Sequence, residues 1–382
     1  MSTMASGQYH IGINAHLLSE QASYRRAGIH GYIANTLRCL PDADPDLRYT
    51  VFVGEAAPEA ADRMRVRRSR LPTGWPPARI LWEQAALPWQ LGGLDLLHGM
   101  AFVTPVLSRC PTVVTIYDLS FVRYPDRLST ARRLYLQRLT GYSARHARRV
   151  IAISESTARD IEALLGIPRE RIDVAVPGVQ ERFQPLPAVE VAAFRERQGL
   201  PARFLLYLGT LEPRKNLTVL LYAYARLPEA LRREAPLILV GGKGWGLNEL
   251  RATIVQLGLE QHVRLEGYAP DDDLPLWYNA ATAFVYPSVY EGWGMPVVEA
   301  LACGTPAIVS AASSLPEAVG DGGLALPPHD IDGWAQALEH ALTNTGWRTA
   351  AAERGLVHAA AFTWEQTARV HAACYRRALA TG

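Results

Sequence analysis

The sequence predicts two α/β domains, each a Rossmann-like unit with a parallel sheet and helices on both of its faces. Short apolar runs rich in Val and Ile alternate with longer amphipathic stretches along most of the chain, which is typical of βαβ units. This alternation is interrupted once, near the middle. The 382 residues are also too many for one ordinary core and suit two domains of roughly 150–200 residues each.

In the first half, five apolar runs bounded by Gly, Pro or Asp are predicted as buried strands. These strands are residues 10–15, 48–54, 94–99, 112–118 and 148–154, with helical patterns at 31–40 and 130–146. The interruption follows at 176–200, where Pro177, Gly178, Pro185 and Pro187 favour an inter-domain crossing.

The alternation then resumes in the second half. The strands expected there are residues 204–210, 237–242, 262–268, 281–287 and 305–310. A last helix at about 364–379 has no strand after it. We therefore expect an N-terminal domain at 1–180, a second domain at 181–360 and a separate C-terminal helix at 361–382.

The bulk composition is that of a folded protein, because 49% of the residues are apolar and 20% are charged. The formal net charge of +2 gives no reason to expect a nucleic-acid partner. The four cysteines form no CxxC pair, which favours a reducing cytoplasm over a disulfide framework or a zinc site. No signal peptide and no apolar run of about 20 residues is found, so the expected location is cytoplasmic, with the inner face of the plasma membrane as an alternative.

The strongest chemical signal follows the fourth strand of the second domain. Gly292 and Gly294 interrupt any regular helix there and let backbone N–H groups approach a ligand closely. Pro296 suits the first helical position and Gly304 suits the position after the helix, so a helix is expected over 296–303. Its N-terminus would offer unpaired N–H groups and a positive dipole end to a phosphate.

Two glutamates frame this turn. Glu291 would lie in the loop just before the helix, and Glu299 within the helix's first turns. An ordinary tight turn with two solvated glutamates is the alternative, since one Gly-rich loop is a weak signal by itself.

A second loop strengthens the signal. Arg214 and Lys215 follow the predicted strand 204–210, and Asn216 is a good N-cap for the helical run 217–227. Cations at a helix N-terminus oppose the helix dipole unless an anion neutralises them. An arginine fork beside a lysine suits a diphosphate, although two solvated loop residues would also fit. Both loops follow parallel strands of one domain, where open α/β sheets bind ligands.

With these motifs, the chain resembles the family 4 retaining glycosyltransferases of GT-B architecture, and within them the bacterial mannosyltransferases of polysaccharide or glycolipid assembly. The family's Glu-x7-Glu pattern matches Glu291 and Glu299, its loop ending in Arg-Lys-Asn matches Gly209 to Asn216, and its N-terminal Gly-rich segment begins at Gly28. The resemblance covers nearly the whole chain. It implies two Rossmann-like domains facing a cleft, with the C-terminal helix packing back toward the N-terminal domain.

The resemblance also implies a donor site. Glu291 would contact hydroxyls of the donor sugar, Glu299 would hold the nucleotide ribose, and Arg214 with Lys215 would hold the diphosphate. The other donor-binding residues that it implies are Gly209, Asn216, Gly241, Tyr268, Ala269, Gly292, Trp293, Gly294, Met295, Pro296 and Val297.

One position departs from the family pattern. Relatives usually carry His-Asp-Leu after the strand at 112–116, whereas this chain has Tyr117-Asp118-Leu119. Tyrosine has an ordinary pKa near 10, so it is a poorer base at neutral pH, and His98 or His30 could supply an imidazole instead. The predicted catalytic set is Glu291, Arg214, Lys215, Tyr117 and Asp118, and the acceptor side is Gly28, His30 and His98.

The predicted reaction uses a nucleotide sugar as co-substrate and no other cofactor. Two cations and a helix dipole could stabilise a leaving diphosphate, so no metal is expected. The Asp271–Asp273 run has a spacing that other glycosyltransferases use for metal, but helix capping is the favoured interpretation here. The resemblance implies retention of configuration. Because no second catalytic carboxylate can be assigned, we expect the acceptor to attack on the face of the leaving group.

The N-terminal half holds two arginine-rich stretches, at 63–70 and 130–149. They are either solvated faces or a surface for anionic lipid or a lipid diphosphate. Trp75, Trp82 and Trp89 recur every seven residues, which favours core packing or a lid.

The function expected from these observations is transfer of a hexose to a glycan or to a polyprenyl-diphosphate-linked acceptor. The first choice of donor is GDP-mannose, and UDP-glucose or another UDP-hexose is the alternative. A non-catalytic sugar-nucleotide-binding protein of the same fold is the alternative from another class. A dehydrogenase is disfavoured, because Gly-Ile-Asn-Ala-His follows Ile11 in place of GxGxxG.

Overall fold

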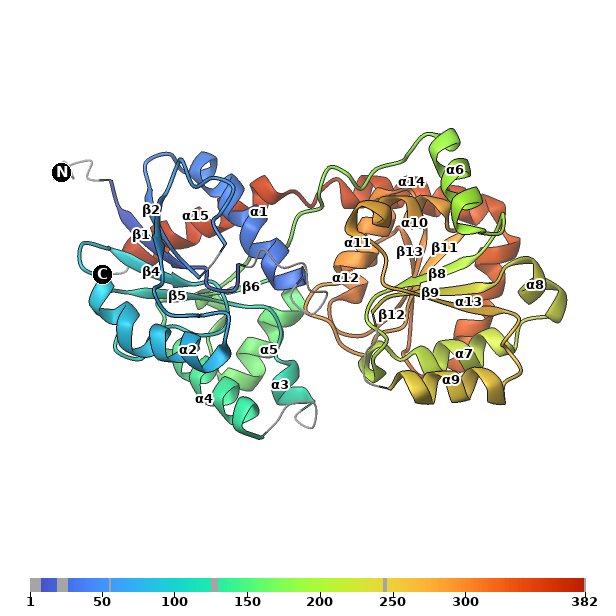
Figure 1. Cartoon of the computed structure of the whole chain (residues 1–382), viewed down its shortest axis with the longest axis horizontal. Coiled ribbons are helices and arrows are strands. Elements are labelled where there is room, and N and C mark those ends of the chain that lie inside the picture. Colours follow the sequence, from blue (N-terminus) through green and yellow to red (C-terminus); the bar gives the residue numbers. More distant parts are fainter. Residues whose placement is uncertain (1–7, 19–26, 55, 125–129, 243–245, 381–382) are drawn as a thin grey trace. The chain divides into compact units, whose positions relative to one another are not determined.

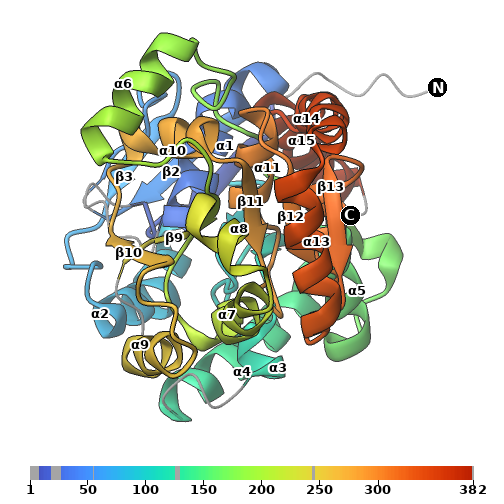
Figure 2. The same ribbon diagram turned by 90° about the vertical axis from the view of Figure 1, so that its right-hand side faces the viewer.

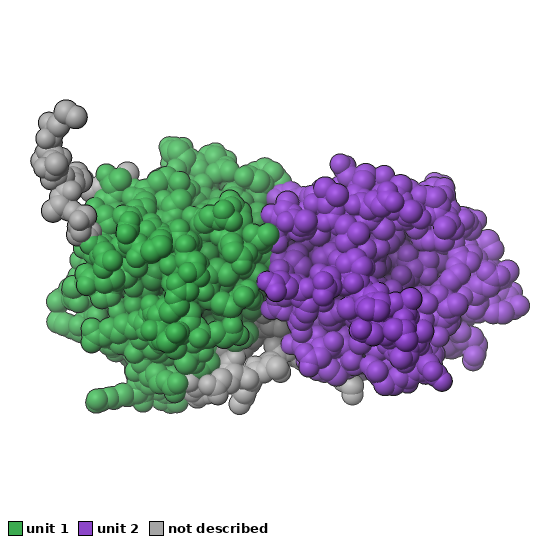
Figure 3. All heavy atoms as spheres, turned by 90° about the horizontal axis from the view of Figure 1, so that it is seen from above, with its two compact units in different colours: residues 1–178, 363–382 green, residues 179–362 purple. Residues whose placement is uncertain are grey.

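The computed structural model describes residues 8–18, 27–54, 56–124, 130–242 and 246–380, which fold into two compact units (Figure 1). Unit 1 consists of residues 1–178 and 363–382, and unit 2 consists of residues 179–362, as coloured in Figure 3. The N-terminal stretch for which no signal peptide was expected lies mostly outside the described residues.

Unit 1 is built on a seven-stranded parallel sheet with the order β3-β2-β1-β4-β5-β6-β7. Its strands are β1 (His10–Asn14), β2 (Arg48–Val53), β3 (Arg65–Arg68), β4 (Leu96–Gly99), β5 (Thr112–Ile116), β6 (Arg149–Ala152) and β7 (Ile172–Val174). Its α-helices are α1 (Ala27–Ala43), α2 (Pro76–Leu81), α3 (Ser120–Arg123), α4 (Thr130–His146), α5 (Glu155–Leu165) and α15 (Trp364–Ala380).

Helices cover both faces of this sheet. In Figure 1, α1 and α15 lie on one side and α4 and α5 on the other. The central strands β4 and β5 are therefore buried along their whole length, which explains their continuous apolar character.

The C-terminal helix α15 belongs to unit 1, as expected. Two buried histidines link it to the rest of the unit: His98 Nδ1 lies 2.8 Å from Tyr375 Oη, and Tyr32 Oη lies 2.8 Å from His371 Nε2. At its solvent side, Arg376 Nε donates to Asp44 at 2.7 Å. These contacts join the last segment of the chain to the first helix and to the sheet.

Unit 2 is built on a six-stranded parallel sheet with the order β10-β9-β8-β11-β12-β13. Its strands are β8 (Leu205–Leu208), β9 (Leu237–Val240), β10 (Val263–Gly267), β11 (Ala283–Tyr286), β12 (Ala307–Ser310) and β13 (Gly323–Leu326). Its α-helices are α6 (Ala188–Gln198), α7 (Leu217–Ala225), α8 (Glu229–Glu234), α9 (Leu247–Gln256), α10 (Leu274–Ala280), α11 (Met295–Ala302), α12 (Leu315–Val319), α13 (Ile331–Thr343) and α14 (Thr345–Ala359).

The helices of unit 2 also form two layers. Helices α7, α9 and α13 pack together on one face of the sheet, and α6, α10, α11 and α14 pack on the other (Figure 1; Figure 2). The sheet between them is fully buried along β8, β9, β11 and β12 apart from its strand ends. Loops at the carboxyl ends of these strands are thus held on a rigid support.

All ten predicted strands are present, and three further strands, β3, β7 and β13, were not predicted. β3 reads Arg-Val-Arg-Arg and β7 Ile-Asp-Val, so neither has the run of apolar residues that marks a buried strand. The edge strand β13 is only partly buried. The proline-containing segment at 176–200, predicted as an inter-domain crossing, also holds α6, which begins directly after Pro187.

Candidate active site

The candidate site of unit 2 lies at the carboxyl ends of its parallel strands. Gly209 follows β8 and Gly241 follows β9, and the two backbones touch: a Cβ atom on Gly241 would lie 1.8 Å from the Gly209 carbonyl oxygen. The close approach of the two strand ends therefore requires glycine at position 241. Tyr268, which follows β10, lies at the same edge and is 54% exposed, and Ala269 is next to it.

A cluster of one carboxylate and two cations forms the centre of this edge. Lys215 Nζ donates to Glu291 Oε1 at 2.6 Å, and Arg214 Nη1 donates to Glu291 Oε2 at 2.9 Å. Glu212 accepts from Arg214 Nη2 at 3.0 Å. The structure thus brings together the two loops that the sequence analysis treated separately.

This cluster changes the argument about the cations. We expected Asn216 to cap α7 and the two cations to need an external anion. Asn216 does precede α7, but it has a left-handed backbone with φ = 57° and makes no side-chain cap; its Nδ2 donates to the Pro328 carbonyl at 2.6 Å. The prediction of a capping side chain is wrong. In addition, Glu291 already supplies a negative charge to both cations.

Burial and charge set the protonation states in the cluster. Burial alone would raise the pKa of Glu291, but Arg214 and Lys215 outweigh it and lower that pKa to about 2. Burial lowers the pKa of Lys215, and the attraction of Glu291 opposes this effect. Lys215 is shielded further by Tyr286, whose hydroxyl accepts from Nζ at 2.6 Å. Glu291 is therefore a carboxylate at neutral pH.

Glu299 lies in a different environment. It sits on α11, where Tyr278 Oη donates to its Oε2 at 2.9 Å. Burial dominates and raises the pKa of Glu299 to about 7, because the hydrogen bond from Tyr278 and the more distant Arg182 only partly offset the loss of water. The two glutamates of the Glu-x7-Glu pattern therefore differ in charge behaviour.

Residues 291–294, between Glu291 and the start of α11, are non-helical, as predicted. Gly294 is the N-cap of α11 with φ = 120°, and a Cβ there would lie 2.9 Å from Leu315. The helix spans 295–302, one residue earlier than expected, with Met295, Pro296 and Val297 in its first turn. Gly292 lies between Glu291 and the buried Trp293 in that loop.

Three serines that the sequence analysis missed hold this loop. Ser288 Oγ donates to Glu291 Oε1 at 2.6 Å, and Ser313 Oγ accepts from the Glu291 backbone N–H at 2.8 Å. Ser314 Oγ donates to the carbonyl of Trp293 at 2.6 Å. Ser313 and Ser314 follow β12, so a run of serines after the neighbouring strand was the available signal.

The Trp293 ring does not face the site. It is buried 5.1 Å from the ring of Phe362, measured between centroids, and edge-on to it. Only the backbone of Trp293 can take the ligand-binding role that was predicted.

Tyr117 and His98, which were predicted to act in catalysis or at the acceptor side, are buried inside unit 1. Tyr117 is 5% exposed, and its hydroxyl donates to the Met100 carbonyl at 2.9 Å. His98 is fully buried, and its Nε2 lies 2.8 Å from Thr115 Oγ1 while Nδ1 contacts α15. Burial raises the pKa of Tyr117 and lowers that of His98. Neither side chain is available to a substrate in this arrangement, so the roles given to them are corrected to packing and hydrogen bonding inside the unit.

The other predicted residues of unit 1 are more accessible. Gly28 is exposed in the first turn of α1, and His30, in the same helix, is partly buried, which lowers its pKa. Asp118 accepts from the Ser120 backbone N–H at 2.8 Å, next to the short helix α3.

A polar group at the end of β1 was also missed. Asn14, the last residue of β1, donates to Glu83 Oε1 at 3.2 Å and lies 3.0 Å from His16 Nδ1. Glu83 sits on a π-helical turn, Trp82–Ala86, a form that occurs often at functional sites. Burial raises the pKa of Glu83 and lowers that of His16 to about 3. No sequence motif marked this group.

Three further predictions concern charge and membranes. Asp271–Asp273 form a single turn directly before α10, and the residues that the structure describes contain no group of three or more His, Cys, Asp or Glu suited to a metal. No side-chain cap is made there; Asp273 instead pairs with Arg197 at 3.3 Å. Within the described ranges, no helix is both long and apolar enough to span a bilayer.

The surface of unit 1 differs from the expectation for its tryptophans. Trp82 is buried, but Trp75 and Trp89 are 64% and 74% exposed, so two of the three are not core residues. Arg109 lies over the Trp89 ring, 4.4 Å from its centroid.

In the arginine-rich stretches, Arg63 pairs with Asp42 at 2.6 Å and Arg149 with Asp173 at 2.5 Å.

Comparison with family models gives two matches that together cover most of the chain. Residues 27–183 match the model described as Glycosyltransferase Family 4, and residues 191–356 match the model described as Glycosyl transferases group 1. The first lies in unit 1 and the second in unit 2, apart from five residues at the boundary.

Individual relatives agree with these models. The O-antigen chain mannosyltransferase B of Escherichia coli is 36% identical over 272 residues, which are 71% of this chain and 71% of that protein. A D-inositol 3-phosphate glycosyltransferase of Streptosporangium roseum is 32% identical over 76% of this chain and 68% of its own. The structure of sucrose-phosphate synthase from Thermosynechococcus elongatus is similar with a TM-score of 0.74 at 22% identity, covering 98% of this chain and 100% of that one.

Proposed function

Since this chain belongs to the family 4 glycosyltransferases, of GT-B fold, we propose that it transfers mannose from GDP-mannose to a glycan or a polyprenyl-diphosphate-linked acceptor. The observation that carries the proposal is the cluster of Arg214, Lys215 and Glu291 at the carboxyl ends of β8 and β11. The choice of mannose is supported by the mannosyltransferase that is 36% identical. A UDP-hexose is the alternative donor.

In the proposed reaction, the bond between the sugar's anomeric carbon and the diphosphate oxygen breaks, and a bond to the acceptor oxygen forms. Negative charge then grows on the leaving diphosphate. Arg214 and Lys215 would stabilise it, helped by the N-terminus of α11, in a partly enclosed site where such interactions are strong. The acceptor's proton would pass to the leaving phosphate oxygen, and no metal is needed for these steps.

Glu291 is proposed to bind sugar hydroxyls. A carboxylate whose pKa is about 2 and which two cations hold is a weak nucleophile, so this geometry favours same-face attack over a covalent sugar–enzyme intermediate. The product would keep the anomeric configuration of the donor. An isolated sugar adduct on Glu291 would overturn this mechanism.

The first experiment is a thermal-unfolding panel of sugar nucleotides, because a ligand that binds the folded state raises the unfolding temperature. GDP-mannose is expected to give the largest rise, and a larger rise with UDP-glucose would shift the proposal to the alternative donor. Nucleotide release with a supplied glycan acceptor, in buffer with EDTA, then tests transfer and metal independence together. Binding without any release would point to a non-catalytic protein.

We also propose that unit 1 docks on an anionic membrane surface. The support is four large apolar side chains of unit 1 that are exposed, Trp75, Leu81, Trp89 and Leu107, and the guanidinium of Arg109, which lies over the Trp89 ring. We expect the protein to sediment with phosphatidylglycerol vesicles and not with phosphatidylcholine vesicles. The double change Trp75→Ser and Trp89→Ser should abolish sedimentation, whereas the control Val255→Ser, at a position 62% exposed in unit 2, should not. Equal binding of all three proteins would contradict the proposal.

A further inference from the structure

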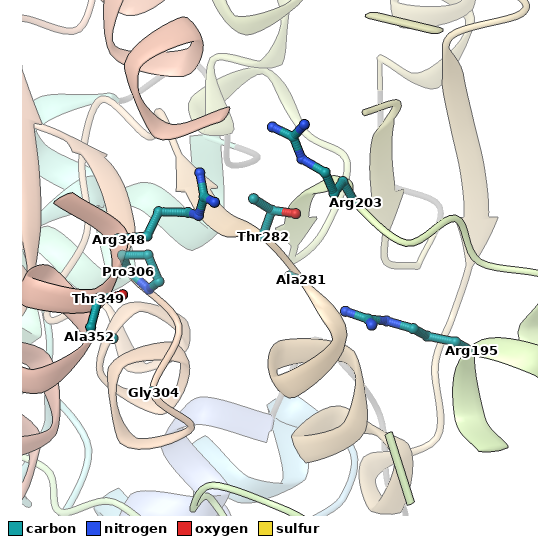
Figure 4. A pocket seen from close by; sticks show the side chains of 9 residues that line it. All are labelled: Arg195, Arg203, Ala281, Thr282, Gly304, Pro306, Arg348, Thr349 and Ala352. Carbon is teal, nitrogen blue, oxygen red and sulfur yellow. The ribbon is translucent and has the colours of Figure 1, made fainter. Parts of the chain in front are cut away.

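A pocket of about 320 Å³ opens in unit 2 at the amino ends of β8, β11 and β12 (Figure 4). Three of the lining residues come directly before strands: Arg203 before β8, Thr282 before β11 and Pro306 before β12. Two more arginines, Arg195 on α6 and Arg348 on α14, also line the pocket. The candidate donor residues lie at the other ends of the same strands. The pocket is therefore separate from the site described above.

The wall of this pocket has an excess of positive charge. It carries three guanidinium groups from three different segments, and none of the described residues that line it is a carboxylate. In Figure 4, the side chains of Arg203 and Arg348 lie on either side of Thr282, and that of Arg195 extends toward Ala281. The carboxylate of Glu234 lies 3.6 Å from Arg203, and its side chain is 64% exposed.

Two of these guanidinium groups are forced close together. Arg203 Nη2 and Arg348 Nη1 both donate to the Leu342 carbonyl oxygen, the latter at 3.1 Å. Burial and the neighbouring charge of Arg203 lower the pKa of Arg348. Two like charges that share one acceptor repel each other, so an anion beside them would relieve the repulsion.

Helix capping explains part of this arrangement. Arg203 and Arg348 bind the last carbonyls of α13, and Arg195 Nη2 donates to the Ala280 carbonyl at the end of α10, at 2.7 Å. Capping leaves other donors unused: Nε of Arg195 and Nε of Arg203 are buried and have no hydrogen-bond acceptor. Capping of two helix ends also does not require all three arginines to line the same cavity.

We propose that this pocket binds a phosphate group, either as free phosphate or as the monoester of a sugar phosphate. Arginine forks match the oxygens of a phosphate, and three of them would balance a dianion. The hydroxyl of Thr349, which is exposed on α14, adds a polar contact at the rim. The volume lies at the lower end of small-ligand sites, which leaves room for a sugar ring. This inference does not depend on the identity of the donor.

The test measures binding of inorganic phosphate and of a hexose 6-phosphate to the full chain by calorimetry, at constant ionic strength set with chloride. Thr349→Glu places a carboxylate in the wall without removing an arginine, and Thr349→Gln is its neutral match in size. Val357→Glu, at a position 77% exposed on the same helix and outside the pocket, controls for added charge. We expect Thr349→Glu to raise the Kd roughly tenfold or more, and both controls to stay within about twofold of the wild type.

A further variant separates this pocket from the donor site, which could also hold phosphate. Arg214→Gln should leave the phosphate affinity of the pocket unchanged. Loss of binding in Arg214→Gln, with normal binding in Thr349→Glu, would overturn the proposal, as would no binding of either probe to the wild type. If the ester binds roughly tenfold tighter than phosphate, the sugar phosphate is the ligand class; equal affinities identify free phosphate as sufficient.

Discussion

Glu291 in unit 2 and Glu83 in unit 1 are both sheltered carboxyl groups beside the carboxyl end of a parallel strand. Their side chains are 11% and 12% exposed. Nevertheless, the pKa of Glu291 is lowered to about 2, whereas burial raises the pKa of Glu83 above its usual value. The same residue type in a similar place therefore has opposite charge behaviour in the two units.

The difference arises from the partners. Glu291 has two cations in direct contact, at 2.6 and 2.9 Å, and a serine hydroxyl at 2.6 Å. Glu83 has one arginine at 3.9 Å and an amide at 3.2 Å. Contact with two cations overcomes desolvation, but a single more distant cation does not. The number of cations and their distance, and not the place at a strand end, thus set the charge behaviour of these two carboxyl groups.

The largest effect is expected for Lys215→Met. This change removes a cation whose side chain is only 7% exposed. We expect the transfer rate to fall by roughly 10²–10³-fold, since a preorganised charge facing the leaving group is lost. Glu291 would lose one cation but keep Arg214 at 2.9 Å, which is expected to cost about 1–3 kcal/mol of unfolding free energy. Initial rates and urea unfolding measure both effects.

The matched control for this change is Arg233→Met. Arg233 pairs with Glu229 at the surface, where its side chain is 71% exposed, so the expected cost is below about 1 kcal/mol. A Lys215→Met protein that keeps its rate within about threefold would remove Lys215 from the proposed mechanism.

Glu291→Gln tests the lowered pKa directly. The folded-state pKa lies below the ordinary 4.5, so the charge of Glu291 stabilises the fold above pH 4.5, and this stabilisation is lost as the pH falls toward 2. The shift corresponds to about 3 kcal/mol at neutral pH. Unfolding free energies of both proteins at several pH values should therefore converge below pH 4.5. A difference that stays constant down to pH 3 would contradict the assignment.

Glu299→Gln is expected to have a smaller effect of the opposite sign. Its folded-state pKa of about 7 is raised, so the stability of the wild type is highest below pH 4.5 and falls as the pH rises toward 7. The variant should lose this pH dependence and be at least as stable at pH 8. If Glu299 binds the ribose, KM for the donor should rise roughly tenfold with little change in kcat. Unchanged KM would remove that role.

The sequence predicted the parts of unit 2 that depend on local patterns. Gly294, Pro296 and Gly304 placed α11 to within one residue, and the loop carrying Glu291 is non-helical as expected. It could not show that Lys215 and Glu291, 76 residues apart in the chain, pair with each other. That contact depends on β8 and β11 being neighbours in the sheet, a non-local property.

Unit 1 was harder to predict for the same reason. The interior positions of Tyr117 and His98 follow from packing against α1 and α15, and α15 comes from the far end of the sequence. Glu83 has no motif around it, and its link to Asn14 spans 69 residues. The apolar pattern predicted strands and helices, but it could not predict hydrogen bonds between polar side chains that are far apart in the sequence.

Glu83→Gln should have the smallest effect and is the sharpest test of the comparison. The amide oxygen of glutamine can still accept from Asn14, and the weak pair with Arg79 at 3.9 Å is the main loss. Because the pKa of Glu83 is raised, the wild type loses stability as the pH rises from below its ordinary pKa through the folded-state pKa, and the variant does not. We therefore expect unfolding free energies within about 1 kcal/mol of each other at pH 5, and a variant at least as stable at pH 8. Glu83→Ala, which removes the hydrogen bond to Asn14 as well, should be less stable than Glu83→Gln at both pH values. If Glu83→Gln instead lost as much stability as Glu291→Gln, Glu83 would be a charged partner of Arg79, and the contrast between the two units would not hold.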